Sequence, residues 1–209
     1  MEQFKDMVSR KVVSEISDKD KAAYIGPVNY ITHHEVYKPG SLSTPICLVS
    51  NSSFKNGNTN LNDICVKGPN TLADIFENLL KFRSYQVALI FDITKAYNSV
   101  RTGIVEKNLR RFWFREDPQE DWKTYGFEYV QFGDRPAAAI MTIAVERAAE
   151  TYQEVAHDLN IDVEEVKEDS IKLLKDTYVD NGTTGGTKKQ VDRMLGFKME
   201  DGSYSGTIP

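Results

Sequence analysis

The stretch Tyr178-Val179-Asp180-Asn181-Gly182 sets a carboxylate beside an Asn-Gly pair, after a mostly apolar run. Asn-Gly is a strong hairpin signal, because both central residues of a type I′ turn need a positive φ. The pattern therefore predicts a β-hairpin with Asn181 and Gly182 in the turn and with Asp180 at the tip.

A second carboxylate follows an apolar segment earlier in the chain. Residues 87–91 are Val-Ala-Leu-Ile-Phe, which predicts a buried strand, and Asp92 comes directly after them. Two acids at strand ends can hold a divalent metal ion if the fold brings Asp92 and Asp180 together. Hairpin aspartates also occur in many folds that do no chemistry, and Asp92 also suits a helix N-cap, so a structural role stays open.

Both segments belong to an ordered series of motifs that resembles reverse transcriptases, most closely those of Pao/BEL-type LTR retrotransposons. The A, B and C motifs of that family resemble Asp92-Ile93-Thr94-Lys95-Ala96-Tyr97, Gly133-Asp134-Arg135-Pro136-Ala137 and Tyr178-Val179-Asp180. Further matches are His33-His34-Glu35-Val36-Tyr37-Lys38-Pro39, Leu61-Asn62-Asp63, Gly68-Pro69-Asn70 and Gly182-Thr183-Thr184-Gly185. The matched motifs follow one another in the family's order, from about residue 28 to residue 195.

The resemblance implies an α+β fold, with the antiparallel sheet of a polymerase palm packed on helices. We expect a polar, peripheral helical segment over residues 1–24, with the fingers and palm region over residues 25–209. The fingers would lie mainly in 25–91 and 113–135, and the palm mainly in 92–112 and 136–209. The thumb and RNase H domains are expected to be absent.

Two helices are predicted from hydrophobic periodicity. Residues 72–80 have helical spacing, with Asn70 or Thr71 as the N-cap. A longer helix is predicted from one continuous apolar stripe, formed by Met141, Ala144, Val145, Ala148, Tyr152, Val155 and Leu159.

The implied activity is that of an RNA-directed DNA polymerase, which adds deoxynucleotides to a primer 3′ end with the help of two metal ions. The resemblance assigns metal binding to Asp92, Asp180 and the backbone carbonyl of Ile93. The metals would be two Mg²⁺ ions, with Mn²⁺ as the alternative. Asn181 belongs to the same catalytic group, at a position where the family usually has a second aspartate.

Substrate binding is assigned by the same resemblance. Tyr97 would lie beneath the incoming sugar and exclude a 2′-hydroxyl, although a core tyrosine is the alternative. Gly133 and Pro136 would shape a loop near the nucleotide, and Arg135 would reach a phosphate. Lys38, in the motif at residues 33–39, is assigned to the substrate-binding group as well.

Three departures from the family pattern favour an impaired site. Asn181 supplies a neutral oxygen in place of a carboxylate. Cys47 stands where the family has a triphosphate-binding arginine, and Asn51 stands where it has an aspartate. The chain also ends soon after the hairpin. A catalytically inactive, reverse-transcriptase-like remnant that binds nucleic acid is therefore the alternative function, and an unrelated α+β binding protein is a third.

Charge and composition bear on the partners. The chain has 209 residues and a formal net charge of −5, with the acidic surplus in its second half. A basic stretch between Arg101 and Arg115 is interleaved with Phe112, Trp113 and Phe114, which suits a template-binding surface, unless both phenylalanines face a core. The expected partners are an RNA or DNA template with primer, deoxynucleoside triphosphates and other regions of a retrotransposon polyprotein. No membrane segment is expected, and the location would be the cytoplasm or virus-like particles.

Overall fold

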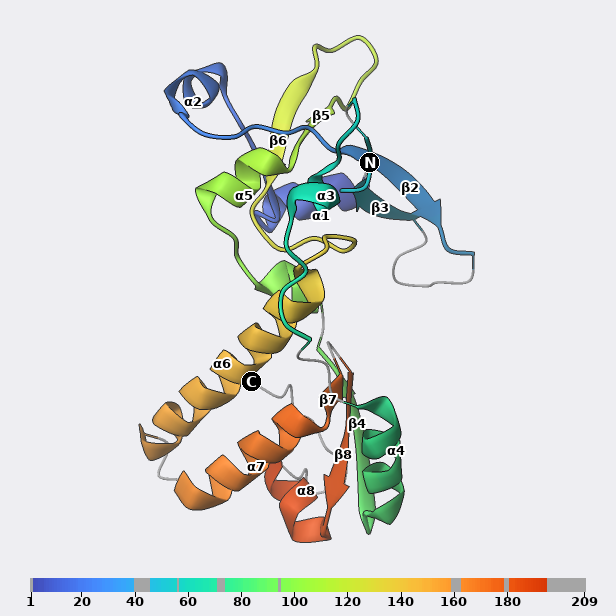
Figure 1. Cartoon of the computed structure of the whole chain (residues 1–209), viewed down its shortest axis with the longest axis vertical. Helices are drawn as coiled ribbons and strands as arrows, with labels where there is room; N and C mark the ends of the chain where they lie inside the picture. Colours follow the sequence, from blue (N-terminus) through green and yellow to red (C-terminus); the bar gives the residue numbers. More distant parts are fainter. Residues whose placement is uncertain are drawn as a thin grey trace. The chain divides into compact units, whose positions relative to one another are not determined.

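The computed structural model describes residues 2–39, 46–55, 57–70, 74–93, 95–158, 163–178 and 181–194. The chain divides into two compact units. Unit 1 comprises Met1–Gly68 and Lys95–Ala137, and unit 2 comprises Pro69–Thr94 and Ala138–Pro209. Both units combine helices with small antiparallel sheets (Figure 1), so the expected α+β class is confirmed. The expected fingers and palm limits stay predictions.

Unit 1 contains two antiparallel sheets. In the first, β6 (Lys123–Phe127) lies between β1 (Val13–Glu15) and β5 (Arg111–Phe114). In the second, β2 (Thr32–Tyr37) pairs with β3 (Ile46–Asn51). The helical segments are α1 (Glu2–Ser9), α2 (Asp18–Ala23), α3 (Leu61–Ile64), the 3₁₀ turn η1 (Ala96–Ser99) and α5 (Ile104–Leu109).

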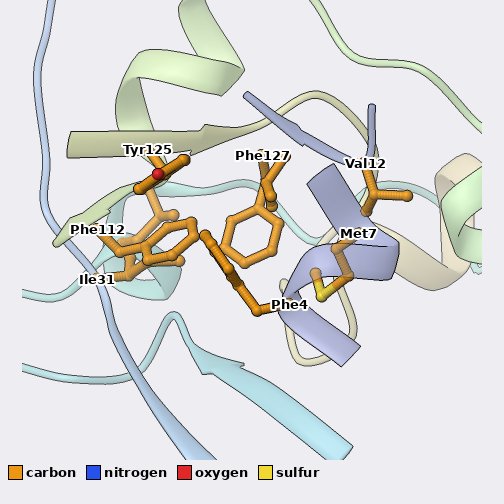
Figure 2. Packing of buried hydrophobic residues seen from close by; sticks show 9 residues of the cluster. Phe4, Met7, Val12, Ile31, Phe112, Tyr125 and Phe127 are labelled. Carbon is orange, nitrogen blue, oxygen red and sulfur yellow. The ribbon is translucent and has the colours of Figure 1, made fainter. Parts of the chain in front are cut away.

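The core of unit 1 is an aromatic cluster to which the first helix contributes directly. Figure 2 shows the ring of Phe4, from α1, among the rings of Phe112, Tyr125 and Phe127. The buried cluster consists of Phe4, Met7, Val12, Val13, Ile31, Leu61, Phe112, Tyr125 and Phe127. The expectation of a peripheral first helix is wrong for α1, because Phe4 and Met7 bury apolar area worth roughly 1.5–3 kcal/mol per side chain.

Strand β5 shows which of its aromatic residues face the core. Phe112 is fully buried, Phe114 stacks on Phe4, and Trp113 between them is 55% exposed. Successive side chains of a strand point to opposite faces of the sheet. The alternative in which Phe112 and Phe114 face a core is therefore confirmed, and Trp113 is left on the outer face.

Unit 2 is built on a three-stranded antiparallel sheet with the order β4-β8-β7. These strands are β4 (Val87–Asp92), β7 (Thr177–Tyr178) and β8 (Asn181–Gly186). The helices are α4 (Ile75–Ser84), α6 (Ala137–Asp158, whose first residue belongs to unit 1), α7 (Val163–Lys175) and α8 (Lys188–Met194). In Figure 1, α4 lies on one side of this sheet and α7 and α8 lie on the other.

Local details of unit 2 differ from the sequence expectations. Strand β4 is confirmed, but Ile90 is 70% exposed, since one face of an antiparallel sheet can be solvated. Helix α4 begins later than predicted, because the Asp74 carboxylate caps it by accepting from the backbone N–H groups of Phe76 and Glu77. The long helix is confirmed as α6, in which Met141 is buried. Leu159, at the end of the predicted stripe, lies outside the described residues.

Within the described residues, no helix combines the length and the apolar character that a membrane crossing needs.

Candidate functional site

Asp92 and Asn181 are brought together by the register of the unit 2 sheet. Strands β4 and β8 pair antiparallel, with Asp92 directly opposite Asn181. Residues that face each other in this way have Cβ atoms about 4.5–5.5 Å apart. Asp92 is exposed, and the backbone continues from it into Ile93. Asp180, the second expected metal ligand, lies outside the described residues, so its distance from Asp92 stays a prediction.

The predicted hairpin is confirmed by the antiparallel pairing of β7 with β8, but the assignment of Asn181 and Gly182 to its turn is wrong. Both residues lie in β8, where Asn181 pairs with Tyr178 and Gly182 pairs with Thr177. Gly182 also does not have the positive φ that a type I′ turn requires. Glycine is needed at position 182 for a different reason: a Cβ atom there would overlap the ring of Phe91 on the neighbouring strand. The absent side chain thus allows close packing between the strands.

Asp176, which was not predicted as a site residue, is a buried aspartate that is hydrogen-bonded to β8. Asp176 directly follows α7 and is 3% exposed. Its Oδ2 accepts hydrogen bonds from the Thr184 hydroxyl at 2.6 Å and from the Tyr85 hydroxyl at 3.1 Å. Its backbone carbonyl accepts from the Thr183 N–H at 3.0 Å. Asp176 therefore ties the ends of α4 and α7 to the strand that carries Asn181.

The groups around Tyr85 favour its role as a hydrogen-bond donor to Asp176. The ammonium group of Lys172 lies 3.8 Å from the centre of the Tyr85 ring. Burial raises the pKa of the Tyr85 hydroxyl, and the negative charge of Asp176 raises that pKa further. Tyr85 thus stays protonated, as a donor to the carboxylate must.

Tyr97 lies in unit 1, whereas Asp92 and Asn181 lie in unit 2. The Tyr97 side chain, in η1, is 9% exposed, and its ring centre is 4.3 Å from that of Phe132. This is the packing expected of a core tyrosine, which the sequence left open as an alternative. Its role against a 2′-hydroxyl stays a prediction.

The loop at residues 133–136 is held by contacts that the sequence did not predict. Asp134 is buried, and its carboxylate accepts from Arg110 Nε at 2.6 Å and from Ser52 Oγ at 2.5 Å. Both partners of the ion pair have side chains no more than 5% exposed. Gly133 before it has a φ of +86°, a conformation that other residues adopt only with strain. Asp134 is thus an anchor of the loop.

Arg135 and Gly133 are linked to α3 through a single side chain. The Asn62 amide oxygen accepts from the Arg135 N–H at 2.8 Å, and the amide nitrogen donates to the Gly133 carbonyl at 2.8 Å. The guanidinium of Arg135 donates in turn to the Asn62 carbonyl at 3.2 Å. Two motifs about seventy residues apart in sequence therefore meet here, and Pro136 follows directly at the start of α6. One guanidinium donor of Arg135 is already used by the protein itself.

The remaining expected site residues lie in β2 and β3 or next to them. Lys38 is exposed directly after β2. The backbone of Cys47 pairs with Val36 in that hairpin, while its side chain lies outside the described part. The Asn51 amide oxygen accepts from the N–H of Ser53 at 3.0 Å. Asn51 therefore shapes the turn after β3.

The donor atoms at the end of β4 suit a hard cation. An exposed carboxylate at Asp92 and a peptide carbonyl at Ile93 are oxygen ligands of the kind that Mg²⁺ takes. The side chain of Asn181 lies outside the described part, so its contribution stays a prediction. Among the described residues there is no group of three or more histidine, cysteine, aspartate or glutamate side chains that could hold a metal ion. Asp180 is not among the residues to which that statement applies.

The sequence matches no protein-family model, and no curated protein matches it.

Proposed function

We propose that this chain is the fingers and palm region of a reverse transcriptase of the Pao/BEL retrotransposon type. Two observations support the proposal: the order of the motifs along the sequence, and the pairing of Asp92 with Asn181 in a three-stranded antiparallel sheet. The pairing carries more weight, because it sets the first residue of motif A directly opposite the residue that follows motif C.

In this proposal, bound divalent metal would activate the primer 3′-hydroxyl and neutralise the charge of the leaving pyrophosphate. Asp92, Asp180 and the Ile93 carbonyl would hold that metal, and Asn181 would add a neutral oxygen. Tyr97, Gly133, Arg135, Pro136 and Lys38 keep their proposed substrate-binding roles. The template with its primer, deoxynucleoside triphosphates and other parts of a polyprotein are the proposed partners, in the cytoplasm or in virus-like particles.

A second candidate is a catalytically inactive protein of the same type that still binds nucleic acid. Asn181 favours it, since the position opposite Asp92 carries no charge where a carboxylate is expected. A divalent cation binds more weakly when one neighbouring negative charge is removed. At a distance of about 4 Å near a protein surface, the lost attraction is on the order of several kcal/mol. The two candidates differ in activity and share their fold.

The experiment compares the unaltered chain with Asn181→Asp. Divalent-metal affinity is measured by titration calorimetry with Mn²⁺, and activity is measured by primer extension on an RNA template. We expect little or no extension by the unaltered chain and an increase in Mn²⁺ affinity of about tenfold or more in Asn181→Asp. Gln86→Glu is the matched control, because it adds the same charge just before the other end of β4, about 20 Å away.

The outcomes separate the two candidates. Metal binding that responds to Asn181→Asp and disappears in Asp92→Asn, with extension gained only by Asn181→Asp, supports an impaired polymerase. The same metal response without any extension favours the inactive nucleic-acid-binding protein. Equal metal affinity in Asn181→Asp, Gln86→Glu and the unaltered chain contradicts a metal site at this sheet and with it the proposed function.

A further inference from the structure

The chain's two tryptophans belong to one hairpin of unit 1, with Trp113 on the outer face of β5 and Trp122 in the connection directly before β6. Trp113 is 55% exposed and Trp122 is 60% exposed. Phe112 and Phe114, the strand neighbours of Trp113, point to the opposite, buried face. Large exposed aromatic side chains are typical of interaction surfaces.

Each indole ring is held in place by a neighbour while it remains exposed. The ring centre of Trp113 is 4.6 Å from that of Tyr30, in the segment before β2. The Arg115 guanidinium carbon lies 4.4 Å from the centre of the Trp122 ring. We call the surface formed by Tyr30, Trp113, Arg115 and Trp122 the tryptophan face. Rings fixed in this way lose little conformational freedom when they bind a partner.

The connection between the two strands is acidic. Over residues 115–123, four carboxylates, at Glu116, Asp117, Glu120 and Asp121, stand against two cations, Arg115 and Lys123, for a net charge of −2. The connection is ordered by Asp117, whose carboxylate accepts from the Gln119 N–H at 2.8 Å and whose carbonyl accepts from the Glu120 N–H at 3.0 Å.

The negative field of this connection reaches the sheet itself. Burial raises the pKa of the Tyr125 hydroxyl, and the carboxylates of Glu15, Glu116 and Glu120 raise that pKa further. One of these acids, Glu116, is partly neutralised by Lys5 at 3.1 Å. Glu116 and Glu120, both in the connection, thus lie close enough to β6 to act on Tyr125.

We propose that the tryptophan face docks a short, extended basic peptide. A lysine or arginine of such a peptide would lie over the exposed face of Trp113, where the ring attracts cations, and further basic residues would pair with Glu120 and Asp121. Arg115 already covers Trp122, so Trp113 is the main ring for an incoming cation. Single-stranded nucleic acid also stacks on aromatic rings, but its phosphates would meet the acidic connection. The inference goes beyond polymerase activity and does not depend on it.

The test uses the intrinsic fluorescence of the full chain. Because Trp113 and Trp122 are its only tryptophans, indole fluorescence reports this surface alone. The probes are a short peptide of alternating arginine and proline, the same peptide with glutamate for arginine, and a short polyuridine strand. We expect the arginine peptide to change the fluorescence saturably and more weakly at high salt, and the other two probes to have no effect.

Variants then assign the contacts, with the labelled arginine peptide followed by fluorescence anisotropy. Trp113→Ala and the double variant Glu120→Gln with Asp121→Asn should each weaken binding about tenfold. Two exposed residues elsewhere in unit 1 give the matched controls, Tyr37→Ala on β2 and Glu106→Gln on α5, which should leave the affinity unchanged. Circular dichroism checks that each variant is folded, and Trp113→Phe, which retains a ring, should lose less affinity than Trp113→Ala.

Three results would overturn the proposal. The first is the absence of a saturable response to the arginine peptide. The second is an equal loss of affinity in the control variants, which would show a non-specific charge effect. The third is tighter binding of polyuridine than of the peptide, with binding strengthened when Glu120 and Asp121 are neutralised, which would make the surface one for nucleic acid.

Discussion

Asp134 in unit 1 and Asp176 in unit 2 are both buried aspartates, but the two units stabilise them differently. Asp134 has a full opposite charge, the guanidinium of Arg110, at 2.6 Å. Asp176 accepts from two hydroxyl groups, those of Tyr85 and Thr184. A buried carboxylate needs such partners because its desolvation is expensive. The first is thus an ion pair, and the second is a hydrogen-bonded node.

The comparison also separates structural acids from candidate ligands. Asp134 belongs to the motif that the sequence analysis connected with nucleotide binding, yet its carboxylate is used to hold its own loop. Asp92, at the end of β4, is exposed. An acid whose oxygens are already bonded within the protein is a poor candidate for an external ligand, whereas an exposed acid at a strand end is a good one.

The largest effect is expected from breaking the ion pair of unit 1. Arg110→Ala leaves the Asp134 carboxylate buried without its cation, and should lower the free energy of unfolding by about 3–5 kcal/mol. Urea denaturation of the purified variants measures this. The control is Arg101→Ala, whose ion pair with Glu128 is 3.7 Å long and exposed on the arginine side, and it should cost no more than about 1 kcal/mol.

The same pair can be removed without leaving a charge behind. Arg110→Met combined with Asp134→Leu should be more stable than Arg110→Ala, since both buried charges are absent. Arg110 Nη1 has no hydrogen-bond partner within the described part of the chain, so its burial already costs free energy. A double variant no more stable than Arg110→Ala would show that the pair contributes through more than charge compensation.

The node of unit 2 should respond less strongly. Asp176→Ala leaves the hydroxyls of Tyr85 and Thr184 without their acceptor, which should cost about 1–3 kcal/mol of unfolding free energy. Asp176→Asn keeps one acceptor oxygen and should cost less. Glu146→Ala, at an exposed position of α6, is the control and should change stability by less than about 0.5 kcal/mol. Equal losses in the alanine and asparagine variants would argue against the hydrogen-bonded node.

Alkaline pH gives an independent measurement of the same node. The pKa of Tyr85 is raised above its usual value of 10.0, first by burial and then by Asp176. The contribution of Tyr85 to stability is therefore present below pH 10.0 and is lost as the pH rises through the raised pKa. In Asp176→Asn the burial remains and the charge is gone, so the alkaline loss should begin at the same pH but end at a lower pH and be smaller in total, as measured by unfolding at a series of pH values. An unchanged pH dependence would show that Asp176 does not act on Tyr85.

Sequence reasoning predicted the elements of this protein better than it predicted their contacts. Strand β4 and the long helix α6 follow from hydrophobic periodicity, which is a local property. The ion pair between Arg110 and Asp134 depends on how distant segments pack, and no local pattern marks an arginine as the partner of a particular acid. Asp176 was missed for the same reason, because its partner Tyr85 lies about ninety residues earlier in the chain.

The turn was predicted at the wrong residues, Asn181 and Gly182, because a glycine can be required for more than one structural reason. The sequence assigned Gly182 to a positive φ, whereas the structure uses its missing side chain for contact with Phe91. A dipeptide pattern does not distinguish these two uses, since both require the same residue. The acid at Asp92 was placed correctly at the end of a strand, and its pairing partner in the sheet became clear only from the register.

The smallest predicted effect separates the two uses of Gly182. In the strand conformation, Gly182→Ala costs stability only because the new methyl group overlaps the Phe91 ring, which can partly move aside. We expect a loss of about 1 kcal/mol, at the low end for overpacking. Combining Gly182→Ala with Phe91→Ala should remove this penalty, so that the cost of Gly182→Ala falls close to zero in the Phe91→Ala background.

A turn at Asn181 and Gly182 would give a different result in the same double-mutant cycle. Alanine at a positive φ is strained whatever its neighbours are, so the cost of Gly182→Ala would be about 1 kcal/mol with or without the Phe91 ring. The interaction energy between the two substitutions, measured by urea denaturation of all four proteins, is thus the deciding quantity. A clear interaction energy supports the register that sets Asn181 opposite Asp92, and additivity would contradict that register and return Asn181 to a turn.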